Sequence, residues 1–262
     1  KKILKKINGV NFNGLSTDTR LIKKGNLFLA IKGKKNNGNK FIKEAFKKGA
    51  ACVVTESHRN YKKKIFKVKN SISFLNSYAK FKRENSSTII ISITGSAGKT
   101  SLKNIINQLL KNFAKTYCAP RSFNNHLGVP ISLSNLSFDD KYGVFEVGMS
   151  KSGEIKDLTK LIQPHIGIIT NIGEAHIENF KNIQGIAKAK SEMIEKIKKD
   201  GTIILNRDDK FFGFLSKKAN LFKLKVVTFG KHKHSDIQLK KVLKKNNYFK
   251  IFVRIKNKTL NF

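Results

Sequence analysis

The sequence predicts an α/β protein. We expect a small N-terminal α/β domain, followed by a doubly wound, mostly parallel sheet with a small extra β-sheet. Three observations support this. The 262 residues exceed the roughly 100–200 residues of a typical domain. From residue 87 onward, short apolar runs alternate with helical patterns. A polar segment, ENSS at 84–87, separates the two parts, so we expect domains at 1–84 and 85–262.

The first part contains two runs typical of strands, LFLAI at 27–31 and AACVVT at 50–55. Between them, apolar residues at 41, 45, 46 and 50 have helical spacing, and a second helix is expected at 71–83. This order of strand, helix, strand and helix predicts a small α/β domain.

The second part begins with STIIISIT at 87–94, a continuous apolar run typical of a strand buried on both faces of a parallel sheet. A helix follows, with apolar residues on one side. We expect further strands at 143–147, 166–170 and 202–205, and helices near 154–162 and 183–197. The tail differs, because runs at 236–243 and 246–256 predict a hairpin that turns near Asn246 and Asn247.

The chain is strongly basic, with 54 Lys and Arg against 17 Asp and Glu and a formal net charge of +37. Such a charge suggests nucleic acid as a partner. However, only six of the cations are Arg, and surfaces that read phosphates or bases are usually richer in Arg. We therefore favour a compositional bias toward Lys and expect no specific nucleic-acid partner. Residues 1–84 hold 23 of the cations and only 4 acids, which hints at a polyanionic ligand there.

Other classes of protein are disfavoured. No apolar run approaches the roughly 18 residues of a membrane helix, and the basic N-terminus lacks the apolar region of a secretory signal. Two cysteines, Cys52 and Cys118, make neither a disulfide framework nor a zinc site, and Cys52 is interpreted as a core residue. We expect a cytoplasmic monomer.

A glycine-rich loop lies between the strand at 87–94 and the following helix. Glycines let backbone N–H groups approach phosphates, and a helix N-terminus adds partial positive charge. Lys99 would reach the β- and γ-phosphates of ATP, and the Thr100 hydroxyl could bind Mg²⁺. The motif is shorter than the usual phosphate loop, since Ile93 stands where its first glycine would be; the alternative is a simple Gly-rich turn. The predicted nucleotide-binding residues are Gly95, Ser96, Ala97, Gly98, Lys99, Thr100 and Ser101.

The short form TGxxGKT resembles the ATP-binding loop of the Mur ligase family, the ATP-dependent amide-forming enzymes of peptidoglycan assembly. Further segments resemble the family in order, and several are similar to its D-alanyl-D-alanine-adding member. These segments are LSTDTRLIKKGNLFLAIKG (15–33), RSFNNHLGVPISL (121–133), FEVGMSKSGEI (145–155), TNIGEAHIENF (170–180), GIAKAKSEMI (185–194) and ILNRDD (204–209).

The resemblance implies a P-loop ATPase domain that uses ATP and Mg²⁺. It implies that D-alanyl-D-alanine is joined to UDP-N-acetylmuramoyl-tripeptide through an acyl phosphate. The implied catalytic residues are Lys99, Lys190 and His176. The implied metal ligands are Thr100, Glu146, His176 and, if carbamylated, Lys190; Lys188 is a second candidate for the carbamylated lysine. Without the resemblance, Glu146 would be a strand-end carboxylate, His176 a structural histidine and Lys190 a surface lysine.

The resemblance also assigns residues to the ligands. Asn206 and Asp209 match the adenine and ribose side, although Asp208 could instead cap a helix there. Asn124 and Asn125 would reach phosphate or substrate oxygens, with helix capping as the alternative. The residues matching the UDP-binding stretch are Thr17, Asp18, Thr19 and Arg20, of which Arg20 could equally form a surface ion pair.

Two departures from the family stand out. Ala97 occupies a position where the family commonly has Asn. The family also has a third, C-terminal domain that nothing in these 262 residues matches, and the chain begins with Lys rather than Met, so we expect a fragment that binds ligands without robust ligation. Alternative functions are a sibling ligase that adds the third peptide residue, a folylpolyglutamate synthetase, or a nucleic-acid-dependent P-loop ATPase.

Overall fold

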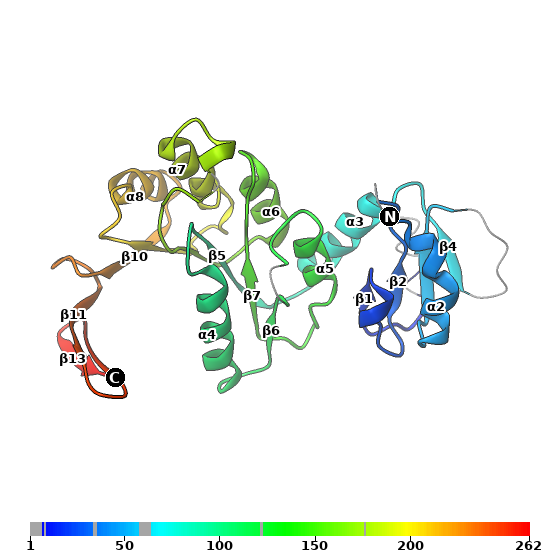
Figure 1. Cartoon of the computed structure of the whole chain (residues 1–262), viewed down its shortest axis with the longest axis horizontal. Helices are drawn as coiled ribbons and strands as arrows, with labels where there is room; N and C mark the ends of the chain where they lie inside the picture. The colour runs from blue at the N-terminus through cyan, green and yellow to red at the C-terminus, as the bar shows by residue number, and fades with distance from the viewer. Residues whose placement is uncertain (1–6, 8, 34–35, 58–63, 121–122, 176) are drawn as a thin grey trace. The chain divides into compact units, whose positions relative to one another are not determined.

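The computed structural model describes residues 7, 9–33, 36–57, 64–120, 123–175 and 177–262. The chain divides into two compact units, which are described separately (Figure 1). Unit 1 comprises Lys1–Ser87 and Leu127–Phe138, and unit 2 comprises Thr88–His126 and Asp139–Phe262. The expected division into 1–84 and 85–262 stays a prediction about domains, but the compact units differ from it. Residues 127–138 pack with unit 1, because Leu127 and Ile131 contact its apolar core.

Unit 1 contains a four-stranded parallel sheet in the order β1-β2-β3-β4. Its strands are β1 (Leu15–Ser16), β2 (Leu27–Leu29), β3 (Cys52–Thr55) and β4 (Ile65–Lys67), and its helices are η1 (Thr19–Leu21), η2 (Gly38–Phe41), α2 (Ile42–Lys47), α3 (Ser71–Glu84) and α5 (Gly128–Ser134). The strands expected at 27–31 and 50–55 and the helix expected at 71–83 are present. The helical spacing from residue 41 corresponds to η2 and α2.

The core of unit 1 lies on both faces of this sheet. Leu27 and Leu29 of β2 pack in one apolar cluster with Leu75 of α3, whereas Phe28 packs in another with Ile42 of α2. Side chains alternate between the faces of a strand, so the three buried residues of β2 serve both clusters.

Unit 2 contains a nine-stranded sheet in the order β13-β12-β11-β10-β9-β8-β5-β7-β6. The strands are β5 (Ile89–Thr94), β6 (Thr116–Cys118), β7 (Tyr142–Glu146), β8 (Ile166–Ile169), β9 (Thr202–Asn206), β10 (Lys225–Gly230), β11 (Ile237–Lys244), β12 (Phe249–Ile255) and β13 (Lys258–Asn261). Neighbouring strands from β6 to β11 are parallel, and β12 and β13 are antiparallel to their neighbours. This confirms the predicted mostly parallel sheet.

The hairpin expected in the tail is formed by β11 and β12, with Lys244 opposite Phe249. The small extra sheet is not separate, however. Phe229 and Gly230 of β10 pair in parallel with Ile237 and Gln238 of β11, so the antiparallel strands continue the large sheet.

The helices of unit 2 are α4 (Lys99–Lys111), α6 (Glu154–Ile162), α7 (Ile183–Ser191) and α8 (Phe212–Leu221), with short turns η3 (Ile177–Asn179) and η4 (Ile194–Lys196). The helix expected over 183–197 is shorter than predicted, because α7 ends at Ser191. The apolar pattern continues beyond Ser191 with Met193, Ile194 and Ile197, and all three are buried. The backbone there forms the short turn η4 and its flanking residues instead of a continued α-helix.

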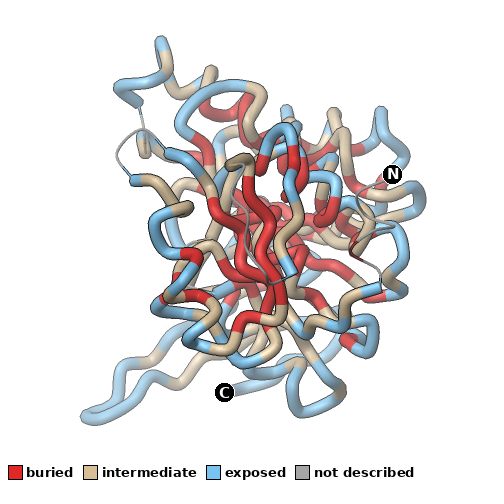
Figure 2. The backbone as a smooth tube through the Cα atoms, turned by 90° about the vertical axis from the view of Figure 1, so that its right-hand side faces the viewer, coloured by how far each residue is buried: buried red, intermediate tan, exposed pale blue. Residues whose placement is uncertain are grey.

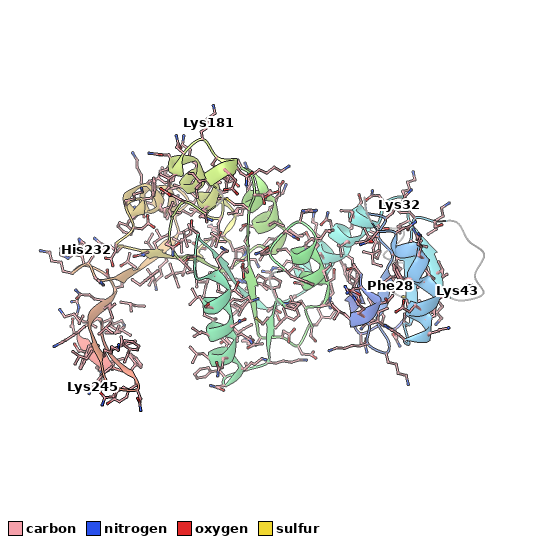
Figure 3. All side chains as sticks on the ribbon, in the orientation of Figure 1. Phe28, Lys32, Lys43, Lys181, His232 and Lys245 are labelled. Atoms are coloured by element: carbon pink, nitrogen blue, oxygen red, sulfur yellow. The ribbon has the colours of Figure 1, made fainter. Side chains whose placement is uncertain are left out.

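The excess of lysine lies mostly at the surface, whereas the buried segments lie toward the centre of the trace (Figure 2). Lys181 and Lys245 project outward from the ribbon, as Figure 3 shows, and both are exposed. Within the described ranges, no helix combines the length and apolar character needed to cross a bilayer.

Candidate active site

The glycine-rich loop joins β5 to the N-terminus of α4, as predicted. Gly98 is the residue that precedes the helix, with φ of 80°, a left-handed conformation that favours glycine. Gly95 has φ of 149°, and a Cβ atom there would overlap the Thr170 hydroxyl oxygen. The backbone conformation therefore favours glycine at both positions, and at Gly95 the close packing against Thr170 requires it as well.

The segment after β8 holds the loop in place. The Ser96 backbone N–H donates to the Asn171 carbonyl (3.0 Å), and the Gly173 N–H donates to the Ser96 hydroxyl (2.8 Å). The Ala97 N–H donates to Asn171 Oδ1 (2.9 Å), and the Thr170 hydroxyl donates to the Ala97 carbonyl (2.6 Å). Sequence reasoning gave no role to Thr170, Asn171 or Gly173, although they lie in the TNIGEAH motif, which was the available signal.

Thr100 and Glu146 meet at the carboxyl edge of the parallel strands. The Thr100 hydroxyl donates to Glu146 Oε2 and the Asn124 amide donates to Glu146 Oε1, both over 2.7 Å. Glu146 is only 2% exposed. A hydroxyl and a carboxylate are hard oxygen donors of the kind that Mg²⁺ prefers, so these residues fit such an ion. Among the described residues, no group of three or more His, Cys, Asp and Glu side chains could hold a metal by itself.

Asn124 does not cap a helix. The helix that follows, α5, is preceded by Leu127 and has no side-chain cap, whereas the amide of Asn124 binds Glu146. The alternative of helix capping is therefore wrong for Asn124. Asn125 lies beside it on the same pocket.

A pocket of ≈ 440 Å³ brings together most of the residues predicted around the phosphates. Its lining includes Lys99, Asn124, Asn125, Glu146 and Lys190, together with His126, Gly148, Met149, Ser150, Glu154, Asp157 and Leu158. Lys99 Nζ donates to the Gly95 carbonyl over 2.8 Å, which folds the side chain back over the loop. His176, predicted as a second metal ligand, lies outside the described residues.

Lys190 is buried in this pocket and 2% exposed. Burial, reinforced by the positive charge of Lys99, lowers the pKa of Lys190 from 10.5 to about 7. Lys188, the other candidate for carbamylation, is exposed and does not line the pocket. The structure thus places Lys190 rather than Lys188 beside Glu146 and Lys99.

The residues expected on the adenine and ribose side are engaged in backbone contacts. Asp209 accepts the Ile172 N–H (2.7 Å) and the Phe211 N–H (2.9 Å), which ties together the loops after β8 and β9. Asn206 Oδ1 accepts the Asp208 N–H over 3.0 Å. Neither Asn206 nor Asp209 lines the 440 Å³ pocket.

Asp208 does not cap a helix, so that alternative is wrong. Helix α8 is preceded by Phe211 and has no side-chain cap. The Asp208 carboxylate accepts the N–H groups of Lys231 (2.6 Å) and His232 (2.8 Å), which follow β10.

Unit 1 has a pocket of its own, of ≈ 570 Å³. Its lining includes all four predicted UDP-side residues, Thr17, Asp18, Thr19 and Arg20, together with Phe28, Ile31, Asn36, Gly38, Phe41 and Glu44.

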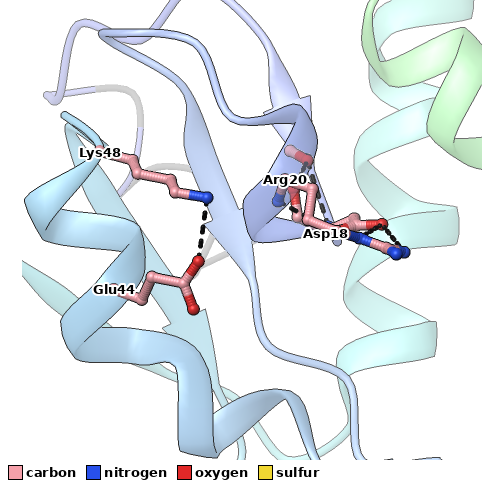
Figure 4. Close-up of polar contacts among 5 residues, drawn as sticks. Asp18, Arg20, Glu44 and Lys48 are labelled. Atoms are coloured by element: carbon pink, nitrogen blue, oxygen red, sulfur yellow. Dashed lines mark hydrogen bonds and ion pairs between the residues drawn. The ribbon is translucent and has the colours of Figure 1, made fainter.

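Arg20 also forms the ion pair that was its alternative role. Its Nη2 contacts Asp18 Oδ2 over 2.6 Å, and this bond lowers the pKa of Asp18 (Figure 4). The side chain of Arg20 is 83% exposed. Glu44 on the same pocket pairs with Lys48 over 2.9 Å. Arg20 therefore combines a surface ion pair with a position on the pocket wall.

A parallel sheet whose strand β5 leads through a Gly-Lys-Thr loop into a helix N-terminus, beside a buried carboxylate, defines the class of P-loop nucleotide-binding proteins. Within that class, the chain belongs to the Mur ligase family. The family description "Mur ligase middle domain" matches residues 93–262, and "Mur ligase family, catalytic domain" matches residues 11–92.

Individual relatives agree with this assignment. The UDP-N-acetylmuramoyl-tripeptide–D-alanyl-D-alanine ligase of Rickettsia prowazekii is 38% identical over 226 residues, which cover 85% of this chain and 50% of the relative. A MurF structure from Acinetobacter baumannii is 27% identical, with a TM-score of 0.82 over 94% of this chain and 54% of that one. A MurF ligase from Thermotoga maritima in complex with ADP is 28% identical, with a TM-score of 0.81 over 95% of this chain and 57% of that one. The chain spans about half the length of the curated relatives it matches.

Proposed function

We propose that the chain acts in the ATP-dependent joining of D-alanyl-D-alanine to UDP-N-acetylmuramoyl-tripeptide during peptidoglycan assembly. The observation that carries this proposal is the single pocket in which Lys99, Glu146 and Lys190 converge beside the phosphate loop. The names of the relatives support the particular substrates, since curated relatives at 30–38% identity are called UDP-N-acetylmuramoyl-tripeptide–D-alanyl-D-alanine ligases.

The proposed reaction has two steps. An oxygen of the tripeptide's terminal carboxylate attacks the γ-phosphorus of ATP, and the bond to ADP breaks, which leaves an acyl phosphate. The amine of D-alanyl-D-alanine then attacks the acyl carbon, phosphate leaves, and the amine loses a proton as the amide forms. Both steps bring anions together, so cations and backbone N–H groups must offset the repulsion. Lys99 and the N-terminus of α4 lie where they could do so.

Mg²⁺, when bound, would neutralise phosphate charge, and Thr100 and Glu146 would hold it. Lys190 could add a third oxygen ligand if it were carbamylated. In that reaction the neutral amine forms an N–C bond with CO₂ and releases a proton. A pKa near 7 leaves about half of Lys190 neutral at neutral pH, which supports this modification. His176 stays a predicted ligand.

The pocket of unit 1 is proposed to bind the UDP part of the substrate. Arg20 would pair with a phosphate, and the hydroxyls of Thr17 and Thr19 are nearby hydrogen-bonding groups on the same wall. On the nucleotide side, Asn206 is better suited than Asp209 to contact a base, because both carboxylate oxygens of Asp209 already accept backbone N–H groups.

Phosphate release from ATP distinguishes this function from its alternatives. We expect ATP with Mg²⁺ and the UDP-tripeptide to bind to the 262-residue chain. We expect any phosphate release to increase only when UDP-tripeptide and D-alanyl-D-alanine are both added. Release stimulated by RNA or DNA instead would contradict the proposal and favour a nucleic-acid-dependent ATPase.

A further inference from the structure

Glu192 follows the last residue of α7 and reaches across to the start of α6. Its Oε1 accepts the Ser152 hydroxyl (3.1 Å) and the Gly153 N–H (2.8 Å), and its Oε2 accepts the Lys156 N–H (3.0 Å). One carboxylate thus satisfies two backbone N–H groups at the N-terminus of another helix.

This position of a carboxylate is unfavourable within its own helix. The C-terminal end of a helix carries partial negative charge, which favours Lys, Arg or His rather than Glu. The N-terminal end of α6 carries the opposite partial charge and has unpaired N–H groups that favour an anion. The position of Glu192 is therefore explained by its hydrogen bonds to the N-terminus of α6 and not by the helix that it follows, α7. Its contact is a tertiary one between two helices.

The contact joins two walls of the 440 Å³ pocket. Lys190 lies on α7, two residues before Glu192, and lines one wall. Glu154, Asp157 and Leu158 of α6 line another. The loop that leads from β7 into α6 is also held from within, since Glu154 Oε2 accepts the Ser150 N–H over 2.6 Å.

We infer that Glu192 is a positioning residue that holds the α6 wall of the pocket at a fixed place relative to Lys190. The inference rests on the proposed function, because positioning the α6 wall matters only if Lys190 acts in this pocket. A purely structural helix cap would stabilise α6 without affecting what happens at Lys190, so the two roles can be separated by experiment.

The test uses the variants Glu192→Ala and Glu192→Gln in the full chain, with Glu195→Gln as the matched control. Glu195 lies three residues further on and accepts a bond from Lys218 over 2.7 Å. It pairs with the Lys156 ammonium over 3.8 Å, whereas Glu192 binds the Lys156 backbone N–H, and it does not line the pocket. The measurements are amide hydrogen exchange at Gly153 and Lys156, ¹³CO₂ incorporation at Lys190 by NMR, and the thermal unfolding midpoint.

In Glu192→Ala we expect amide exchange at Gly153 and Lys156 to accelerate about tenfold or more, because a charge-assisted bond is lost. We expect carbamate at Lys190 to fall at least about threefold, measured at a temperature where each variant is fully folded. Glu192→Gln should lie between, since Oε1 can still accept whereas its amide NH₂ would face the Lys156 N–H. Glu195→Gln should leave both measurements unchanged.

Unchanged carbamate in Glu192→Ala, with faster amide exchange, would overturn the inference and leave Glu192 as a helix cap. Equal losses of carbamate in Glu192→Ala and Glu195→Gln would overturn it too, because the effect would then follow general destabilisation. A wild-type chain that takes up no ¹³CO₂ at Lys190 would instead contradict the role of Lys190 in the proposed function, and with it this inference.

Discussion

The two pockets of this chain are built in opposite ways. In unit 2, Glu146 and Lys190 are each 2% exposed, and the Glu146 carboxylate accepts bonds from two side chains. In unit 1, Arg20 lies on the pocket, its side chain is 83% exposed, and it pairs with Asp18. The pocket of unit 2 thus contains buried charged groups, whereas the charged Arg20 on the pocket of unit 1 is exposed to solvent.

This difference in burial determines how strongly the charged residues of each pocket indicate a function. Burial of a charge costs several kcal/mol unless it is well paired, so a buried lysine next to another cation is retained only where it is useful. An exposed ion pair contributes little to stability, and its presence says correspondingly little about its purpose. Substitutions at the two pockets should therefore have very different effects.

The largest effect is expected from Lys190→Ala, which removes the buried amine. We expect ligation by a chain competent for turnover to fall by about a thousandfold or more, with partial rescue by short-chain carboxylic acids that can occupy the space. The measurement is the ligation rate with and without added acid. Lys188→Ala is the control and should change the rate less than about twofold. Full activity of Lys190→Ala would exclude the proposed role.

A second effect concerns stability and pH. Burial lowers the pKa of Lys190 from 10.5 to about 7 in the folded chain. Below pH 7 the amine is protonated in both the folded and the unfolded chain, so its burial destabilises the folded state by the full amount. Above pH 10.5 the amine is neutral in both states, and this destabilisation is absent. Lys190→Met should thus be more stable than wild type at pH 7, by about 3–5 kcal/mol, and this advantage should shrink toward pH 10.5. Urea unfolding of both proteins in CO₂-free buffer checks this. A pH-independent difference would contradict it, since the other lysines are common to both.

The phosphate loop allows a matched comparison of two glycines. Gly95→Ala should weaken ADP binding at least about tenfold more than Gly98→Ala, because a Cβ at Gly95 overlaps Thr170. A Cβ at Gly98 would meet no atom of the described residues within 4 Å beyond its own chain neighbours. Gly98→Ala should cost about 1 kcal/mol for its positive φ. Titration of ADP into each variant measures the difference. Equal affinities would show that the contact with Thr170 does not control the loop.

The smallest effect on folding is expected from Arg20→Ala. Since Arg20 is exposed, the thermal midpoint should hardly change, whereas affinity for UDP should fall about tenfold if the guanidinium pairs with a phosphate. Asp139→Ala offers a control, because its exposed carboxylate pairs with Lys115 in unit 2 and lies on neither pocket. If Arg20→Ala binds UDP as tightly as wild type, Arg20 does not bind the phosphate, and its ion pair with Asp18 is its only role among those considered.

Sequence patterns anticipated the strands and helices with strong apolar periodicity, such as β5, β8 and α6. They missed short or half-buried elements such as β1 and β6, which have two and three residues and little pattern of their own. The backbone of β1 is instead completed from a distance, since Asn135 Oδ1 accepts the Leu15 N–H and its Nδ2 donates to the Leu15 carbonyl. A contact across 120 residues leaves no local signal.

For the candidate site, the order of the motifs indicated the family, and the pattern of strand, glycine-rich loop and helix indicated the phosphate loop. Glu146 and Lys190 were assigned through the resemblance of their segments, and their roles stay predictions. Sequence ranked Lys190 above Lys188 only through the resemblance, and it could not decide whether Asp208 caps a helix. Those choices depend on which side chain the fold buries and which distant N–H groups it brings near. Glu192 shows the same limit, because its position is unfavourable for α7 and is explained only by the N-terminus of α6. Local patterns determine chemistry and periodicity, whereas burial and long-range hydrogen bonds are decided by the tertiary structure.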